Sequence, residues 1–328
     1  MYRSIVVPLD GSPFAEQAIA PAIAIAERCG AKVTFTRAWD PANYRYTSEL
    51  TPPFLSPWAQ DRLHATDYLT GVASRVRPTT AVAINVALLV GQPVEAINQH
   101  LTRTGTDLVV MSTHGLTGWS RAWLGSVADA LVRVATVPIL LIRPREVPSA
   151  AASIGFKCML LPLDGSAEAE QILPQAAAIG AAGVERFVLL RVEQPMQMPV
   201  YPYANTRRTS DIDQAVTDQV VTEARTYLTR MAEWLSVRCP GATMEVDVRI
   251  ADQPDNAIVN AVRDYQADLV ALTTHAQRGV RLLVESVADR VLRATHGSLL
   301  VLRPTDQAET GAGVANVPVS KRMSGVVV

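Results

Sequence analysis

The sequence predicts an α/β protein made of two tandem Rossmann-like domains, each a parallel sheet with helices on both faces. Short β-branched runs alternate with helical stretches through most of the 328 residues, as expected for βαβ units. The expected strands are apolar at consecutive positions, which indicates that both faces of each sheet are covered. Three sequence blocks also recur in the same order, so one domain is present twice.

The repeated blocks define the two copies. They read VVPLDGS at 6–12, DLVVMSTHG at 107–115 and SVAD at 126–129, and return as LLPLDGS at 160–166, DLVALTTHA at 268–276 and SVAD at 286–289. Between the copies lies a short, small and polar segment, typical of a linker. We therefore expect a first domain at 1–145, a linker at 146–155, a second domain at 156–304 and a disordered tail at 305–328.

Local signals mark each element of the first copy. Ser12-Pro13 opens a helix with an N-cap and a first-turn proline, and Gly30 ends that helix as a C-cap. Ser56-Pro57 and Gln92-Pro93 open two further helices in the same way. The expected strands are 5–9, 32–38, 81–88, 108–111 and 139–142, and the expected helices are 12–29, 56–77, 92–104 and 126–135.

The second copy follows the same plan, with strands expected at 159–163, 187–192, 243–250, 269–273 and 299–302. Insertions at 40–55 and 193–210 follow the second strand of each copy and emerge at the carboxyl edge of the sheet, where open α/β folds bind ligands. Each insertion carries tyrosines, namely Tyr44, Tyr46, Tyr201 and Tyr203. A ligand cover and a plain surface loop or domain contact both remain open.

The composition indicates a globular protein with 48% hydrophobic and 19% charged residues. A net charge of −1 gives no reason to expect a nucleic acid partner. The apolar runs are too short for a membrane span, and the first residues lead into a strand without a secretory signal. We therefore expect a cytoplasmic protein. Its cysteines, Cys29, Cys158 and Cys239, lack the spacing of a metal site.

Asp10 is the first candidate site residue, because it lies at the carboxyl end of the first strand. A carboxylate there can accept hydrogen bonds from an adenine amino group or from ribose hydroxyls. It can equally cap the following helix, and the repeat at Asp164 fits that structural role too. The sequence leaves both roles open.

The loop after the fourth strand is a stronger candidate. It contains Gly115, Gly118 and Gly125, and it ends at Ser126, where a helix begins. Glycines and the amides of a helix N-terminus are the layout that binds phosphate, although such loops can also be plain connections. His114 lies in the same loop, but no nucleophile or metal accompanies it. We therefore expect His114 to have a structural role.

With these residues, the chain resembles the universal stress protein family over nearly its whole length. The family's ATP-binding signature is G-x-x-G, nine residues, then G-[ST]. The first copy reads Ser112-Thr113-His114-Gly115, nine residues, then Gly125-Ser126, with Ser112 in place of the first glycine. The resemblance implies five parallel strands per domain in the order 3-2-1-4-5, and pairing of domains through the last strand. It implies a nucleotide site formed by Pro8, Asp10, Ala38, Met111, Ser112, His114, Gly115, Gly125, Ser126 and Val127.

The second copy departs from this signature. Thr273, Ala276 and Glu285 replace its three glycines, and the loop is one residue shorter. A carboxylate that faces a triphosphate is repulsive, so we expect ATP in the first domain only. The second domain would then serve as an internal partner in a pseudo-dimer, with 139–142 and 299–302 as the seam.

The predicted function is an ATP-binding stress-response protein that acts as a sensor or regulator and not as a fast enzyme. Mg²⁺ can accompany the phosphates, although no protein ligand for it can be named. Two alternatives remain: a nucleotide-free scaffold or signalling module of the same fold, and a slow ATPase. The sequence also leaves open whether the tandem chain pairs again into a homodimer.

Overall fold

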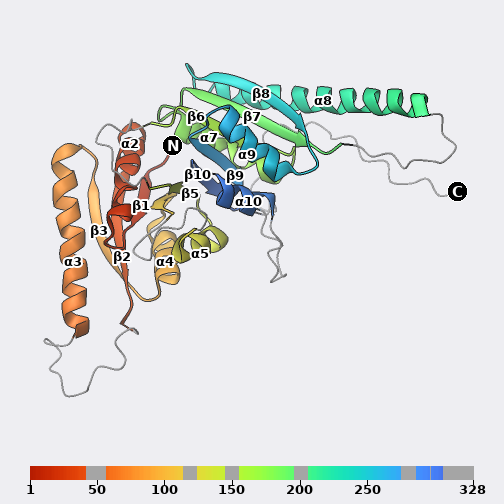
Figure 1. Ribbon diagram of the computed structural model, residues 1–328. Coiled ribbons are helices and arrows are strands. Elements are labelled where there is room, and N and C mark those ends of the chain that lie inside the picture. The colour runs from red at the N-terminus through yellow and green to blue at the C-terminus, as the bar shows by residue number, and fades with distance from the viewer. Residues whose placement is uncertain are drawn as a thin grey trace.

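The protein is an α/β structure in which both halves contribute to one ten-stranded sheet (Figure 1). The computed structural model describes residues 1–41, 57–113, 124–144, 155–195, 206–274, 286–295 and 297–305, without the side chains of 57–58 and 206–215. The strand order is β3-β2-β1-β4-β5-β10-β9-β6-β7-β8, so each half follows the order 3-2-1-4-5. The predicted fold class is confirmed.

In the first half, the elements are β1 (Ser4–Pro8), α1 (Pro13–Glu16), α2 (Ile19–Cys29), β2 (Lys32–Trp39), α3 (Pro57–Val76), the short 3₁₀ helix η2 (Arg77–Thr79), β3 (Ile84–Val90), α4 (Pro93–Thr104), β4 (Leu108–Ser112), α5 (Ser126–Val134) and β5 (Ile139–Ile142). In the second half, they are β6 (Cys158–Pro162), α6 (Ala167–Glu170), α7 (Leu173–Gly180), β7 (Arg186–Glu193), α8 (Thr206–Ser236), β8 (Thr243–Ile250), α9 (Pro254–Asp264), β9 (Leu269–Thr273), α10 (Val287–Ala294) and β10 (Ser298–Leu302).

The first predicted helix is in fact two helices in each half. The break between α1 and α2 precedes Pro21, and the break between α6 and α7 precedes Pro174. A proline ring clashes with the carbonyl four residues earlier and supplies no N–H, so a continuous helix cannot run through it. The predicted N-cap at Ser12 is confirmed, since its hydroxyl accepts from the Ala15 amide at 3.1 Å, and Ser166 caps α6 in the same way, accepting from the Ala169 amide at 3.1 Å.

Two further boundaries differ from the prediction. The third strand spans Ile84–Val90 and not 81–88, because residues 80–83 connect η2 to it without strand structure. Helix α8 begins at Thr206, inside the segment predicted as an insertion, and it packs Leu228 and Leu235 against the sheet. Residues 42–56 and 196–205, with all four tyrosines of the insertions, lie outside the described residues, as does the tail from 306 onward.

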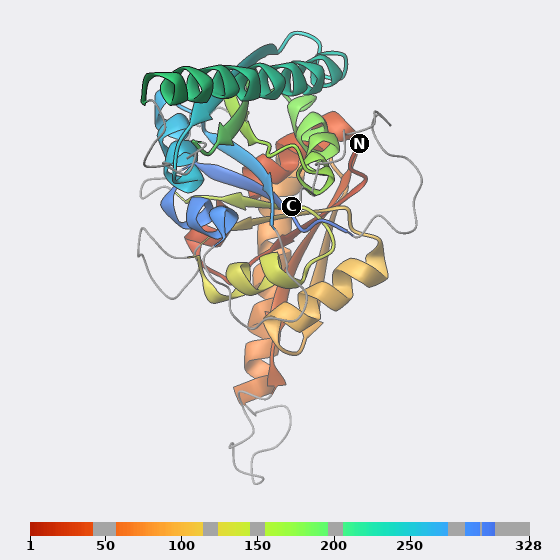
Figure 2. The same ribbon diagram turned by 90° about the vertical axis from the view of Figure 1, so that its right-hand side faces the viewer.

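Two apolar layers cover the sheet, and each runs through both halves. One layer, here the α2 face, joins α2, α3, α7 and α8 to the sheet. The other layer, here the α5 face, joins α4, α5, α9 and α10 to the opposite side. The long helices α3 and α8 lie at opposite ends of the molecule, beside the edge strands β3 and β8 (Figures 1 and 2).

The halves meet at β5 and β10, which pair antiparallel with Leu140 opposite Leu300. All other pairings in the sheet are parallel. The predicted seam strands are therefore the ones that pair. Away from the sheet, the Tyr2 hydroxyl donates to Gln175 Oε1 at 3.0 Å.

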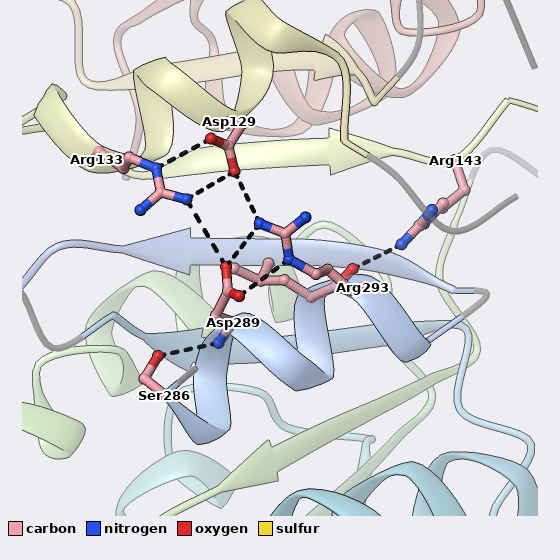
Figure 3. A network of polar contacts seen from close by, with 7 residues as sticks. Asp129, Arg133, Arg143, Ser286, Asp289 and Arg293 are labelled. Carbon is pink, nitrogen blue, oxygen red and sulfur yellow. Dashed lines mark hydrogen bonds and ion pairs between the residues drawn. The ribbon is translucent and has the colours of Figure 1, made fainter. Parts of the chain in front are cut away.

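Four charged side chains connect α5 to α10 across this seam (Figure 3). Within each helix an arginine binds the aspartate one turn earlier, at 3.0 Å for Arg133 and Asp129 and at 3.0 Å for Arg293 and Asp289. Across the seam, Arg293 lies 3.5 Å from Asp129, and Arg133 lies 3.9 Å from Asp289. Each charge therefore has one opposite charge on its own helix and another across the seam. All four side chains are only partly exposed.

Two further arginines cap the C-terminal ends of these helices from the opposite half. Arg143, just after β5, donates to the Leu292 carbonyl at 2.7 Å (Figure 3). Arg303, just after β10, donates to the Arg133 carbonyl at 3.0 Å. A cation at a helix C-terminus is favourable because unpaired carbonyls collect there. The seam is therefore built symmetrically by both halves.

Among the described helices, none combines the length and the apolar character needed to cross a membrane.

Candidate functional site

The predicted site residues converge on the carboxyl ends of β1, β2 and β4. Strand β1 lies between β2 and β4, and the chain winds in opposite directions on the two sides of the β1–β4 pair. Such a switch point opens a crevice that commonly holds a ligand. Pro8 ends β1, Met111 and Ser112 end β4, and Ala38 lies one residue before the end of β2. These four predicted residues therefore occupy the same edge of the sheet.

The start of α5 is fixed to this edge by the backbone. The Gly125 amide donates to the Thr113 carbonyl at 2.7 Å, and the Thr113 amide donates to the Ile142 carbonyl at 3.0 Å. Gly125 is the N-cap of α5, and no side chain in the described residues caps that helix. The first-turn amides, from Ser126 and Val127 onward, therefore begin beside β4 without a capping hydroxyl or carboxylate from the part of the chain that the structure describes. This arrangement suits an anion.

The second half uses the equivalent residues differently. There, Ser286 is the N-cap of α10, and its hydroxyl accepts from the Asp289 amide at 3.1 Å (Figure 3). The same Ser-Val-Ala-Asp block therefore produces a capped helix in one half and a helix without a side-chain cap in the other. In the first half the equivalent amide, that of Asp129, donates to the Gly125 carbonyl at 2.9 Å, so the Ser126 hydroxyl is not used as a cap.

Asp10 and Asp164 share a structural contact. Asp10 Oδ1 accepts from the Ser12 amide at 2.9 Å, and Asp164 Oδ1 accepts from the Ser166 amide at 2.8 Å. Each aspartate therefore shapes the turn that leads into the first helix, but the cap of that helix is the following serine and not the aspartate. Because this contact is the same in both halves, it does not distinguish their ligand-binding capacity.

An arginine and a tyrosine support this turn, and the sequence reasoning missed them. The Arg37 guanidinium lies 5.3 Å from the centroid of the Tyr68 ring, and a Cβ on Gly11 would lie 3.2 Å from Arg37 Nη1. Gly11 also has a φ of +95°, which other residues rarely adopt. The Tyr68 hydroxyl donates to Glu16 at 3.0 Å. Burial, followed by this carboxylate, raises the pKa of Tyr68.

The second half repeats this arrangement. Arg191 lies 5.4 Å from the Tyr227 ring centroid and close to Gly165, whose φ is +85°. Burial, followed by the Glu170 carboxylate, raises the pKa of Tyr227. The only sequence signal for this support was the recurrence of an arginine near the end of the second strand in each half. We interpret the arrangement as part of the scaffold, because it occurs in both halves.

The repeated aspartate that precedes the fourth strand of each half is also structural. Asp107 accepts from the amides of Arg3 and Ser4 at 2.8 and 3.0 Å. Asp268 accepts from the amides of Lys157 and Cys158 at 2.9 and 3.0 Å. Each aspartate ties the start of the first strand to the start of the fourth, so part of the sequence repeat reflects folding alone.

The central part of the predicted phosphate loop lies outside the described residues. This applies to His114, Gly115, Gly118 and Arg121, and to His275, Ala276 and Glu285 in the second half. The described residues bring together Pro8, Asp10, Ala38, Met111, Ser112, Gly125, Ser126 and Val127. In the portions with assigned positions, no group of three His, Cys, Asp or Glu side chains is arranged to hold a metal ion.

Comparison with known families gives one match, found twice. The model of the universal stress protein family matches residues 1–143 and again residues 155–303. Among curated proteins, a universal stress protein from Thermus aquaticus is 32% identical over 143 residues, which cover 44% of this chain and 100% of that protein. That relative therefore corresponds to one half of this chain.

Several solved structures resemble this chain over 92% of its length, and two of them serve as examples. A universal stress protein from Archaeoglobus fulgidus DSM 4304 gives a TM-score of 0.59 at 15% identity, covering 92% of this chain and 98% of that one. A functionally unknown protein from Pseudomonas aeruginosa PAO1 gives a TM-score of 0.61 at 15% identity, covering 92% and 93%. At this identity the similarity concerns the fold alone.

Proposed function

Because the chain belongs to the universal stress protein family as a tandem two-domain member, we propose that it binds ATP in its first half and acts as a nucleotide-dependent regulator. The observation that carries this proposal is the difference between the two helix starts. The first turn of α5 has no side-chain cap in the described residues, whereas Ser286 caps α10. An anionic ligand supplies the partners that a helix start otherwise lacks.

The position of this helix start supports a nucleotide as the ligand. It lies at the end of β4, next to the switch point where Pro8, Ala38 and Met111 meet. An apolar floor beside an anion-binding helix end suits a flat base joined to phosphates. Asp10, at the end of β1, is then the proposed partner of the adenine or ribose.

The second half has a different proposed role. The Ser286 hydroxyl is used as the cap of α10, and the sequence places Glu285 where the first half has Gly125. We assign this half to the internal partner of a pseudo-dimer, which pairs with the first half through β5 and β10. Nucleotide binding at α5 would act on partner proteins through this shared sheet and the charged seam.

The proposed role is regulatory and not that of a fast enzyme. ATP is the proposed cofactor, and Mg²⁺ accompanies its phosphates without a dedicated protein ligand. Slow hydrolysis is a separate activity, and phosphate release above background that disappears in Asp10→Ala would establish it.

Isothermal titration with ATP, ADP and AMP, after removal of co-purified nucleotide, tests the proposal. We expect one site per chain and a preference for ATP. Two sites per chain would show that the second half also binds nucleotide. The absence of binding to all three nucleotides would favour a nucleotide-free scaffold.

A further inference from the structure

Thr36 in β2 carries a hydroxyl that has no hydrogen-bond partner in the part of the chain with described positions. The residue is nevertheless 0% exposed. Its backbone belongs to the sheet, where its carbonyl accepts from the Leu9 amide at 2.7 Å. A buried hydroxyl without a partner costs free energy, and native structures contain few such groups.

The strand register places this hydroxyl in the floor of the proposed nucleotide site. Thr36 pairs with Pro8 on β1. Val6 pairs with Val109 on β4, so Pro8 and Met111 follow two residues later and face the same side. Thr36, Pro8 and Met111 therefore form one row across three neighbouring strands.

The row lies on the α5 face. Phe35 packs into the core of the α2 face, so its neighbour Thr36 points to the opposite side. Ala38, two residues further along β2, pairs with Leu89, whose side chain belongs to the core of the α5 face. Pro8 and Ala38 are only half-buried, so the row opens toward the sheet edge where α5 begins.

The equivalent row in the second half is apolar. Pro162 pairs with Leu190, which is 0% exposed and packs in the core of the α5 face. Leu272 occupies the position equivalent to Met111. Threonine is common in strands, but the leucine at the equivalent position of β7 shows that the fold does not need a hydroxyl there. The hydroxyl belongs only to the half that has the helix start without a side-chain cap.

We infer that the Thr36 hydroxyl is a base-recognition group, which hydrogen-bonds the edge of the adenine ring bound between Pro8, Ala38 and Met111. A hydroxyl donates one hydrogen bond and accepts others. Adenine offers ring nitrogens as acceptors and an amino group as donor. This inference rests on the proposed function, and it adds a residue that contacts the base from the floor of the site.

The matched variants are Thr36→Val and Thr34→Val. Both replace a hydroxyl by a methyl group of nearly the same size, on the same strand and on the same face. Thr34 lies further from the carboxyl edge of the sheet, and it is the control for any general effect on β2. Affinity for ATP and AMP is measured by titration for both variants and for the unaltered chain, and melting temperature is measured without nucleotide.

We expect Thr36→Val to weaken ATP and AMP binding by the same factor, about three- to tenfold, the loss of one hydrogen bond. Without nucleotide, its melting temperature should equal or exceed that of the unaltered chain, because an unpaired buried hydroxyl is removed. Thr34→Val should bind both nucleotides normally.

Three results would overturn the inference. Unchanged affinity in Thr36→Val would show that the hydroxyl does not contact the ligand. A loss restricted to ATP would assign the hydroxyl to the phosphates, and a lower melting temperature without nucleotide would show that it has a partner within the protein. If the unaltered chain binds neither nucleotide, the proposed function itself fails, which is distinct from each of these results.

Discussion

The two halves of the chain contain the same Ser-Val-Ala-Asp block at the start of their last helix, yet they use its serine differently. In the second half Ser286 caps α10, whereas in the first half Gly125 takes the N-cap position and α5 begins at Ser126. The residue on the second strand that lies beside the end of the first strand also differs, and it is polar Thr36 in the first half and apolar Leu190 in the second. At these two positions the second half has a capping serine and an apolar residue, whereas in the described part of the first half Ser126 does not cap its helix and the Thr36 hydroxyl has no hydrogen-bond partner.

What the halves share is equally informative. The turn aspartates Asp10 and Asp164 bind equivalent backbone amides in the two halves, and so do the strand ties Asp107 and Asp268. A residue that repeats with its contacts is explained by folding alone. Candidate ligand contacts are better sought where the halves differ.

The largest expected effect comes from Gly125→Glu, which introduces the residue of the second half into the first. Two unit charges about 4 Å apart near a protein surface repel by about 4 kcal/mol. We therefore expect ATP affinity to fall by at least about a hundredfold, measured by titration. Glu285→Gly is the control and should leave the affinity of the first half unchanged. Normal binding by Gly125→Glu would contradict the assignment of the phosphate site.

Asp10→Asn and Asp164→Asn separate binding from folding. Asparagine keeps an oxygen that can accept from the serine amide, but it removes the charge that strengthens a hydrogen bond to a ligand. We expect Asp10→Asn to weaken ATP binding about tenfold, while Asp164→Asn has no effect on affinity. Both should cost about 1 kcal/mol or less of unfolding free energy, measured by denaturant titration. Equal affinities in the two variants would leave Asp10 with a structural role only.

Ser126→Ala and Ser286→Ala should change different properties, namely ATP affinity in the first case and stability in the second. Ser286→Ala removes an N-cap and should cost about 1 kcal/mol of stability without changing ATP affinity. Ser126→Ala removes a hydroxyl that does not cap its own helix, so we expect a stability change within about 0.5 kcal/mol and a several-fold loss of affinity. If the stability losses were equal, the difference between the two helix starts would be disproved.

The smallest expected effect concerns pH. His100 is buried in α4, and the equivalent residue in the second half is Ala261. Burial, followed by repulsion from Arg103, lowers the pKa of His100 below its ordinary value of 6.5. The unfolded chain then binds this proton more readily than the folded chain does. The stability associated with neutral, buried His100 is therefore fully present above pH 6.5. It decreases as the pH falls through that value toward the lower pKa of His100 in the folded chain.

His100→Ala, which copies the second half, should flatten this dependence. The measurement is the unfolding free energy between about pH 5 and pH 7.5 in both proteins, a range that brackets the ordinary histidine pKa. The comparison concerns the slope, because the smaller side chain also lowers the overall stability. Identical slopes would exclude His100 as the origin.

Much of the architecture could be predicted from sequence because its signals are local. Apolar runs marked the strands, Ser-Pro and Gln-Pro pairs marked helix starts, and the repeats revealed two halves. The pairing of these halves through their last strands was an expectation from the family resemblance, and β5 and β10 do pair. The single long first helix was wrong because the effect of Pro21 and Pro174 on the preceding turn was overlooked. The start of α8 was missed because its first residues are polar and resemble the insertion before them.

The sequence by itself determined the fold class, the tandem repeat and the asymmetry of the phosphate signature, because each is written in neighbouring residues. Only the tertiary structure decided that Thr36 shares a row with Pro8 and Met111, that Arg37 supports Gly11, and that Arg293 reaches Asp129 across the seam. Those contacts depend on strand register and helix packing between segments far apart in the chain. A local pattern carries no record of which distant residue will lie opposite.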